Sequence, residues 1–264
     1  MNLAVLDYNV SFFRVRNVFQ EGYNDPYLNS DVLGVQNLCK DLNPDVICFQ
    51  EFFNDQNSQI YNSITRFGEL GYQYYLMSSP RHDNGLNRGL ITFSRFPIVK
   101  AGIIVQSENR YNGAIYTDLK IKEDTIRLIN VHLNSMELHL SRRGNRNILS
   151  YFYDTYTNTN RIKQNQLNTI SAFIDNSDIP IIVVGDFNDN QYSYTYKQLA
   201  SRFANGQKES GNGLGLTYYS KIPLLAFRID HLFYSHSIRS MEFKTLSNFD
   251  YSEHKPIWAK LSVN

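Results

Sequence analysis

The stretch of this sequence best suited to chemistry is an apolar run that ends in Gly185-Asp186-Phe187-Asn188. Asp186 and Asn188 are two residues apart, so in an extended chain both side chains face the same side. One carboxylate and one carboxamide oxygen placed together could hold a hard cation or a water molecule. The alternative is an Asx turn that closes a buried strand, since Gly, Asp and Asn are common turn residues. Other polar side chains must converge on this pair for it to indicate metal or phosphate chemistry.

Glu51 and Asn9 also follow apolar runs. Glu51 comes directly after the nearly continuous apolar run 46–50, and an ionised carboxylate at the rim of a core is costly unless it is paired or bound to metal. Glu51 is therefore either a metal ligand or a structural glutamate in a salt bridge. Asn9 ends the run 3–8 in the same way, and by itself it is typical of a turn.

His132 and Asn134 close the run 126–131. Their spacing predicts that they share one face, where they could grip a phosphoryl oxygen together. Alternatively, neighbouring backbone groups satisfy the hydrogen bonds of the histidine and it has no chemical role.

Asp230 and His254 supply a further acid and an imidazole. Asp230 lies inside the largely apolar strand predicted at 227–234, so a buried carboxylate there needs a partner. If that partner is His254, a charge-assisted hydrogen bond would orient the imidazole and raise its basicity. The alternative is a salt bridge to Arg228 or another basic neighbour.

The elements that must position these residues alternate between strands and helices. Runs rich in Val, Ile, Tyr and Phe predict strands at 3–10, 45–50, 72–77, 89–94, 114–121, 125–133, 179–184, 227–234 and 256–263. Apolar positions at intervals of three and four predict helices at 30–41, 58–70, 160–175 and 193–204. Residues 114–133 have the pattern of a hairpin that turns at 122–124, which favours mixed sheets. We expect a two-sheet core with helices outside it.

Length and composition favour one domain over residues 1–264, with 42% hydrophobic residues and no repeat or linker. The formal net charge of +1 lacks the basic excess that proteins wrapping nucleic acid usually carry. Cys39 and Cys48 are isolated and are expected to be small buried apolar residues rather than metal ligands.

No run approaches the ~20 apolar residues that span a bilayer, and no charged-then-apolar leader precedes the first strand. From the residues alone we expect either a cytoplasmic protein or the soluble domain of a membrane-anchored or exported protein trimmed at its N-terminus. We expect a monomer.

Taken together, the strand-end motifs resemble the endonuclease/exonuclease/phosphatase superfamily, and the resemblance runs from residue 3 to residue 263. The motifs in chain order are Asn9, Gln50-Glu51, His132 to Asn134, Gly185 to Asn188, Arg228 to Asp230 and Glu253-His254. The resemblance implies an α/β fold, a four-layer α-β-β-α sandwich of two mixed β-sheets flanked by helices, with the active site where the strand ends of the two sheets meet. It also implies hydrolysis of phosphoesters with Mg²⁺ or Mn²⁺ as cofactor. Residues 185–190, 193–196, 211–218 and 228–230 look like a bacterial branch whose members often carry an N-terminal membrane segment.

The resemblance also implies a role for each residue of the site. Glu51 becomes the main metal ligand, with Asn9 close enough to assist directly or through water. Asp186 and Asn188 position the attacking water and the scissile phosphate. His254, oriented by Asp230, is the general base or an imidazolium that stabilises the phosphate. The charge that develops on the transition state is neutralised by His132.

One motif departs from the family pattern, because Glu253 stands in Ser252-Glu253-His254 where the family has Ser-Asp-His. The carboxylate is kept but lies one methylene further out, which changes metal geometry or preference if Glu253 is a ligand. An Arg- and Tyr-rich insertion, residues 137–160 with Arg142, is expected to border the site, as is a polar loop that contains Arg88. Together with Asn134, these two arginines are our predicted substrate-binding residues. A solvated helix and loop is the alternative for the insertion.

These observations favour a phosphodiesterase or phosphatase that acts on a nucleotide, a single-stranded nucleic acid or a phosphorylated small molecule. A DNA or RNA endo- or exonuclease is the first alternative, and it requires a continuous basic groove. The second, from another class, is a non-catalytic binding module on the same fold. Such a module would be expected to have lost at least one of Glu51, Asp186, Asn188, Asp230 or His254, and all five are present.

Overall fold

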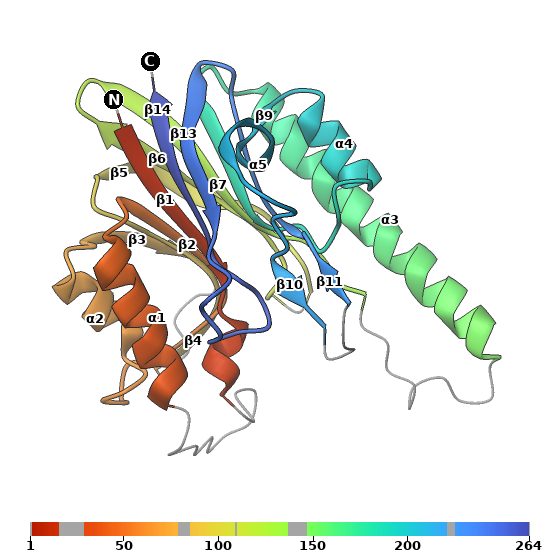
Figure 1. The fold of residues 1–264 in the computed structure, drawn as a ribbon, viewed down its shortest axis with the longest axis horizontal. Coiled ribbons are helices and arrows are strands. Elements are labelled where there is room, and N and C mark those ends of the chain that lie inside the picture. Colours follow the sequence, from red (N-terminus) through yellow and green to blue (C-terminus); the bar gives the residue numbers. More distant parts are fainter. Residues whose placement is uncertain are drawn as a thin grey trace.

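Two six-stranded β-sheets stacked face to face form the centre of the computed structural model (Figure 1), which describes residues 2–15, 29–78, 85–108, 110–136, 147–220 and 225–263. The strands of the first sheet, in spatial order, are β13 (Ile238–Thr245), β14 (Ile257–Val263), β1 (Asn2–Asn9), β2 (Val46–Asp55), β4 (Leu86–Ser94) and β3 (Tyr74–Met77). Those of the second are β5 (Ile98–Gln106), β6 (Gly113–Ile121), β7 (Asp124–His132), β8 (Ile181–Asp186), β12 (Asp230–Tyr234) and β9 (Ala204–Asn205). A separate two-stranded sheet pairs β10 (Tyr218–Tyr219) with β11 (Ala226–Phe227).

Each sheet contains one parallel pair among antiparallel neighbours. β1 is parallel to β2 in the first sheet, and β7 is parallel to β8 in the second. Both sheets are therefore mixed, as predicted. The predicted hairpin is also present, since β6 and β7 pair in register from Gly113 with His132 to Ile121 with Asp124.

Helices cover the outer face of each sheet, so the chain has the predicted four layers. α1 (Asn29–Leu42) and α2 (Ser63–Glu69) pack on the first sheet, and α3 (Ile148–Asp175) and α4 (Tyr194–Ala200) pack on the second (Figure 1). The short helix α5 (Gly206–Ser210) contacts β12 and β13.

Three apolar clusters hold the four layers together. The middle one lies between the sheets and includes Val5, Cys48 and Val184. The two outer ones join each sheet to its helices, as Phe49 does on the first sheet and Val183 on the second. Because inner strands are buried on both faces, they appear in the sequence as continuous apolar runs. Both cysteines are free and buried, as expected.

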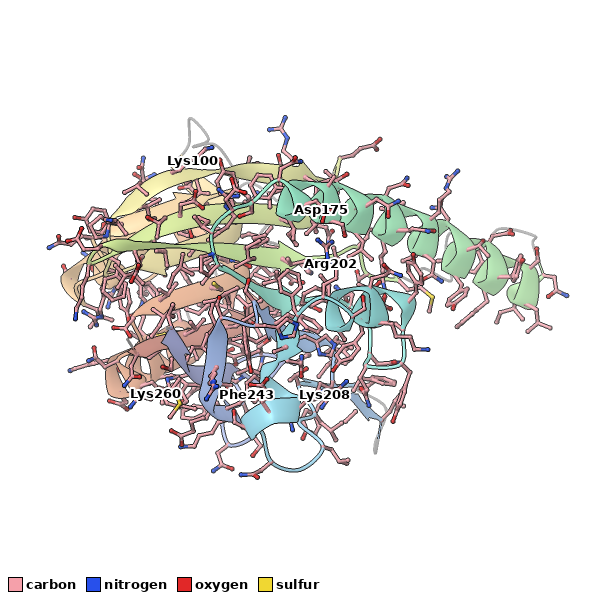
Figure 2. The ribbon with its side chains drawn as sticks, turned by 90° about the horizontal axis from the view of Figure 1, so that it is seen from above. Lys100, Asp175, Arg202, Lys208, Phe243 and Lys260 are labelled. Atoms are coloured by element: carbon pink, nitrogen blue, oxygen red, sulfur yellow. The ribbon has the colours of Figure 1, made fainter. Side chains whose placement is uncertain are left out.

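Helix α3 is longer than the sequence predicted. It begins at Ile148 rather than near residue 160, and the Asn147 side chain caps it by accepting a hydrogen bond from the Leu149 amide. Its N-terminal half extends beyond the ends of the strands, while at its other end Asp175 pairs with Arg202 (Figures 1 and 2). The second half of the predicted insertion is therefore helical, and Arg142 lies outside the described residues.

Four strands of the structure were not predicted, β5, β13 and the two-residue strands β9 and β10, and β2 runs past residue 50 to Asp55. Within the described part of the chain, no helix is long and apolar enough to cross a membrane.

Candidate active site

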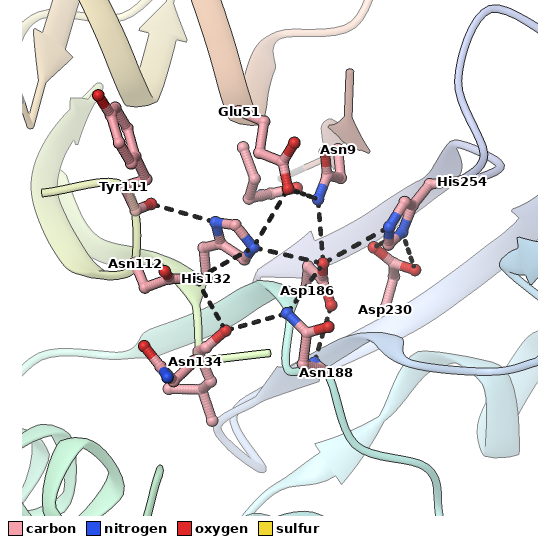
Figure 3. Close-up of polar contacts among 12 residues, drawn as sticks. Asn9, Glu51, Tyr111, Asn112, His132, Asn134, Asp186, Asn188, Asp230 and His254 are labelled. Atoms are coloured by element: carbon pink, nitrogen blue, oxygen red, sulfur yellow. Dashed lines mark hydrogen bonds and ion pairs between the residues drawn. The ribbon is translucent and has the colours of Figure 1, made fainter. Parts of the chain in front are cut away.

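Most of the polar residues singled out by the sequence meet at one edge of the two sheets (Figure 3). Asn9 is the last residue of β1, and Glu51 lies in the neighbouring strand β2. In the other sheet, His132 ends β7 and Asp186 ends β8. Since parallel strands end at the same edge, each parallel pair delivers two polar side chains there. Asp230 joins them because β12 is antiparallel to β8 and begins opposite Asp186.

Glu51 reaches this edge through a β-bulge. The pairing of β2 with β4 shifts register between Phe49 and Phe52, and Glu51 has a φ of +48°. Phe49 and Phe52 are three residues apart, yet their rings stack at 5.7 Å in the cluster beneath the helices. The bulge therefore reverses the alternation of faces and turns Glu51 away from the helices and toward the other sheet. A positive φ at glutamate is backbone strain of the kind that functional sites store.

Gly185 lets β8 approach β7 closely enough to place Asp186. Its φ is +141°, and a Cβ atom at this position would lie 2.0 Å from the Val131 carbonyl oxygen. The motif forms the Asx turn and also presents a carboxylate oxygen to the site, so the two interpretations from the sequence are compatible. Asp186 Oδ1 accepts a hydrogen bond of 2.8 Å from the Asn188 amide, which is the Asx turn. Asp186 Oδ2 is left to face the other polar residues of the edge.

Asn9 links the two carboxylates. Its Nδ2 donates to Asp186 Oδ2 at 3.0 Å and to Glu51 Oε1 at 3.3 Å, and its Oδ1 accepts from the Ser11 amide at 3.0 Å (Figure 3). With partners on both ends, the amide orientation is fixed by hydrogen bonding. In this arrangement Asn9 holds the carboxylates together as a donor, because its oxygen is already taken by the backbone.

His132 lies against the same two carboxylates. Its Nε2 is 3.7 Å from Glu51 Oε1 and 3.6 Å from Asp186 Oδ2. Its Nδ1 is 3.1 Å from the Tyr111 carbonyl oxygen, and a carbonyl can only accept, so Nδ1 carries a hydrogen. This hydrogen bond fixes the ring with Nε2 turned toward the site.

Asp230 and His254 form the predicted pair. His254 Nδ1 lies 3.1 and 3.0 Å from the two Asp230 carboxylate oxygens, and His254 Nε2 lies 3.6 Å from Asp186 Oδ2. Burial alone lowers the pKa of His254, but the negative charges of Asp230 and Asp186 outweigh it and raise the pKa to about 10. The imidazole is therefore held as an imidazolium between two carboxylates.

Glu253 is fixed by a contact that the sequence did not predict. The Ser11 hydroxyl donates to Glu253 Oε2 at 3.0 Å. Ser11 begins the turn Ser11–Arg14, whose four residues have φ between +47° and +54°, a conformation costly for residues with a side chain. Both Ser11 and Glu253 line the cleft described next.

A cleft of about 1240 Å³ opens over these residues. Glu51, Asp186 and His254 lie on its wall, with Asn188 beside them. Opposite sides come from α3, from the segment between β8 and α4, and from β10 and β11. Tyr218 of β10 packs on the His254 ring with a centroid distance of 5.1 Å, so the imidazolium is covered on one side and faces the cleft on the other.

A family model described as the endonuclease/exonuclease/phosphatase family matches residues 8–254. The chain belongs to this family. The match spans nearly the whole described fold, from the end of β1 to His254, which lies three residues before the start of β14. Members of the family are metal-dependent hydrolases of phosphoester bonds. None of the curated proteins matches the chain.

Solved structures of the family share this fold. An endonuclease/exonuclease/phosphatase protein from Beutenbergia cavernae has a TM-score of 0.69 at 16% identity, over 100% of this chain and 72% of that one. The human nocturnin catalytic domain has a TM-score of 0.66 at 19% identity, over 100% and 95%. A humanized D. rerio TDP2 has a TM-score of 0.69 at 15% identity, over 99% of both chains. At these identities the likeness shows the fold alone.

The carboxylates of the cleft fit the divalent metal that family members use. Hard cations such as Mg²⁺ prefer oxygen ligands, and Glu51, Asp186 and Glu253 all offer carboxylates to the cleft. Within the described residues, the ion-pair partners of Glu51 and Asp186 are imidazoles, and Glu253 has no lysine or arginine as a partner. This surplus of negative charge is what a bound cation would neutralise.

A second arrangement of metal-binding groups exists deeper in the site. Asp186, Asp230 and His254 place three ligand atoms within 4.8 Å of one another. Asp230, however, already accepts from His254 through both oxygens, and an imidazolium has no free lone pair for a metal. We therefore favour the cleft side, at Glu51, as the place of the metal.

Two of the three predicted substrate-binding residues, Asn134 and Arg88, do not converge on the site. Asn134 follows the end of β7, where strand alternation stops, and Figure 3 shows its side chain turned away from the carboxylates. Its amide nitrogen donates to Gln166 instead. Arg88 lies on β4 with its guanidinium 5.9 Å from the centroid of the Phe53 ring, and it is not among the described residues that line the cleft. Arg142 is outside the described part of the chain.

Lys163 was missed by the sequence argument. It projects from α3, is 5% exposed, and donates to the Asn188 carbonyl oxygen at 2.6 Å and to Asp189 Oδ1 at 2.9 Å. It therefore clamps the turn that presents Asn188, which has a φ of +49°. The apolar periodicity of α3 gives no sign that Lys163 is buried, because a lysine in this pattern is expected to face solvent.

Proposed function

We propose that the chain is a divalent-metal-dependent phosphodiesterase. The observation that carries this proposal is the convergence of Glu51 and Asp186, joined by Asn9, next to the Asp230–His254 pair at the mouth of one cleft. Fold alone does not give function, but here a cluster of carboxylates, an imidazolium and a polar turn meet at the same place. Human nocturnin, which shares the fold, is described with a bound sulfate anion, a tetrahedral group like phosphate.

A diester is favoured over a monoester by charge. A phosphate monoester carries nearly two negative charges at neutral pH, because its second pKa is about 6, whereas a diester carries one. Among the described residues of the cleft wall, Lys163 is the one lysine or arginine, and its ammonium is paired with Asp189. Among the described residues of the wall, the His254 imidazolium is therefore the cation left for the phosphate beyond what a bound metal would supply.

In the proposed mechanism, Asp186 and Asn188 hold the attacking water, and Asp186 Oδ2 accepts its proton as the water oxygen bonds to phosphorus. The ester P–O bond on the opposite side breaks, and the leaving alkoxide takes up a proton from solvent. The Asn9 amide keeps this carboxylate in place. His254 is protonated, so its Nε2–H donates to a phosphoryl oxygen as negative charge develops there, and Asp230 stabilises the imidazolium. His132 lies beside the same carboxylates and adds a second imidazole to this face.

Glu51 and Glu253 would hold Mg²⁺ or Mn²⁺, which polarises a phosphoryl oxygen and neutralises charge when bound. Asn9 would assist through Glu51, whose Oε1 it already contacts. The Ser11 hydroxyl, through its hydrogen bond to Oε2, keeps the Glu253 carboxylate in the cleft.

The test is hydrolysis of bis-p-nitrophenyl phosphate beside p-nitrophenyl phosphate and a labelled single-stranded oligonucleotide, each with Mg²⁺, with Mn²⁺ and with a chelator. Metal-dependent cleavage with the diester as the better of the two nitrophenyl compounds is the expected result. A better rate on the monoester would make the protein a phosphatase. No turnover of any compound, with metal still bound, would instead support the non-catalytic binding module.

Variants tie the activity to the site. Asp186→Asn and His254→Ala should abolish turnover with the far-ultraviolet circular dichroism unchanged, and Glu51→Gln should weaken metal binding in a calorimetric titration. Asp178→Asn is the matched control, because it makes the same change at an exposed position before the opposite end of β8. Full activity in the Asp186 variant would refute the assignment.

A further inference from the structure

Tyrosine side chains line the cleft beside the carboxylates. Tyr156 projects from α3, and Tyr192 and Tyr194 come from the segment between β8 and the first turn of α4. They are 55%, 76% and 56% exposed. Three large aromatic residues gathered in water around one cleft indicate a binding surface rather than ordinary surface composition. None of them has a part in the chemistry proposed above.

Most polar groups that line the cleft beside these tyrosines are neutral, and the two charged ones, Lys163 and Asp189, are paired with each other. α3 contributes Thr159, Asn160 and Gln164 to the cleft wall, and the segment that leads into α4 contributes Ser193 and Thr195. Amide and hydroxyl groups of this kind donate and accept hydrogen bonds without carrying charge. This part of the cleft therefore suits an uncharged group with several hydrogen-bonding atoms.

We propose that Tyr156, Tyr192 and Tyr194 bind the base of a nucleoside phosphodiester whose phosphate lies at Glu51 and Asp186. A nucleobase is flat, uncharged and edged with donors and acceptors, so it matches both the rings and the amides of the wall. Tyrosine rings stack on any base, and each such contact contributes substantially to binding. The subsite rests on the phosphodiesterase proposal, because it places the scissile phosphate at that site.

Two other substrate chemistries match the cleft less well. A sugar that carries several phosphates would need arginine or lysine forks, and the one lysine or arginine among the described wall residues, Lys163, is occupied by Asp189 and the Asn188 carbonyl. An acyl chain would need a continuous apolar wall, whereas Asn160 and Gln164 interrupt this one.

The experiment compares two esters with the same leaving group, thymidine 5′-(p-nitrophenyl phosphate) and methyl p-nitrophenyl phosphate, in the presence of Mg²⁺ or Mn²⁺. We expect a higher kcat/KM for the thymidine ester. Tyr156→Ala and Tyr192→Ala should each lower the ratio of the two values by roughly 5- to 150-fold, the range expected for one stacked base. Tyr153→Ala is the matched control, since Tyr153 is 68% exposed on the same helix but does not line the cleft. A ratio near one in the unaltered protein, or a ratio unchanged in both variants, would overturn the subsite.

Binding separates failure of the subsite from failure of the hydrolase proposal. Adenosine 5′-monophosphate and ribose 5-phosphate differ only by the base, and calorimetry measures both without turnover. Tighter binding of the nucleotide, lost in Tyr192→Ala, would support the subsite even if neither ester were cleaved. Cleavage of both esters with equal kcat/KM, together with equal binding of the two phosphates, would leave the hydrolase and remove the subsite.

The nucleoside could belong to a small nucleotide or to a single strand. Dithymidine monophosphate and a ten-residue oligothymidylate distinguish these sources. A much lower KM for the longer substrate would identify a strand that continues past the tyrosines, and an equal or lower KM for the dinucleotide would identify a small nucleotide. Cleavage of neither, with the thymidine ester also uncleaved and no preference for the nucleotide in binding, would count against the proposal.

Discussion

Mild acid should weaken the fold through His231. This residue follows Asp230 in β12, is 2% exposed, and donates from Nε2 to the Asp189 carbonyl oxygen at 2.9 Å. Its ring packs against Phe187 and Tyr196. Burial lowers the pKa of His231 from 6.5 to about 4, because the charged form is penalised in an apolar surrounding.

The direction of the pH effect on stability follows from the fact that the fold prefers the neutral form of His231. The folded protein binds this proton less readily than the unfolded chain, so the stabilisation is complete above pH 6.5 and is lost as the pH falls toward 4. At about 1.4 kcal/mol for each pKa unit, the whole effect is roughly 3 kcal/mol. About 2 kcal/mol of it should disappear between pH 7 and pH 5.

Urea unfolding at these two pH values measures the effect against a variant. His231→Gln keeps an amide donor for the Asp189 carbonyl but cannot take up a proton in this range. Other titrating groups are common to both proteins, so the difference between their pH dependences reports His231. If the variant loses as much unfolding free energy between pH 7 and pH 5 as the unaltered protein, then His231 is not the acid-sensitive group and the reasoning from burial is wrong.

Four substitutions make further predictions. Gly185→Ala should lower the unfolding free energy in urea by about 3 kcal/mol, because its Cβ would meet a backbone carbonyl oxygen of β7 at 2.0 Å; an unchanged midpoint would show that β8 can move. Lys163→Met should cost about 2 kcal/mol in the same assay and lower kcat with it, whereas Lys163→Arg should restore both if the clamp on the Asn188 turn is what matters. Asp230→Asn should reduce kcat by about 100-fold or more, and an NMR titration of metal-free protein should show the pKa of His254 far below its value of about 10; no movement of that pKa would separate the pair. Glu253→Asp, which restores the residue usual in the family, should keep diesterase activity, and an inactive variant would mean that the longer side chain is required.

The inner strands could be predicted because burial on both faces leaves a continuous apolar run, as in residues 181–184 of β8. Among the edge strands, β3 lies within the strand predicted at 72–77, whereas β5 and β13 were not predicted. β5 and β13 each have one neighbour and alternate irregularly between buried and exposed positions, so polar residues such as Lys100 and Glu242 hide the period of two. The first three turns of α3 were missed for a different reason. They contain Thr and Asn residues of low helix propensity, and contacts elsewhere in the fold override that preference.

Which residues meet at the site was predictable, but how they meet was not. Strand-end positions brought Asn9, His132 and Asp186 together as expected. The sequence gives no sign of the bulge that turns Glu51 across the sheet, because a positive φ at glutamate has no compositional signature. Asn134 was predicted to face the site and does not. The prediction assumed that strand alternation continues to residue 134, whereas β7 ends at His132.

The convergence of two sheets on one site also requires that they be held in register, and buried polar residues just beneath the site do this. Gln50 Nε2 donates to Asp7 in its own sheet at 2.7 Å and to Asn130 Oδ1 in the other sheet at 2.8 Å. Asn130 Nδ2 donates back to the Phe49 and Ile91 carbonyl oxygens at 3.2 and 3.0 Å.

Apolar side chains between two sheets tolerate sliding by a fraction of a residue, whereas a hydrogen bond is lost within about half an ångström. Asp7 and Asn130 each precede a site residue by two positions, on the same face of their strands as Asn9 and His132. A slip that broke the bonds of Gln50 would therefore separate Asn9 from Asp186 by the same distance. For this reason the buried network belongs to the function of the site even though no substrate reaches it, and its cost in desolvation is offset by fixing the one alignment in which the carboxylates meet.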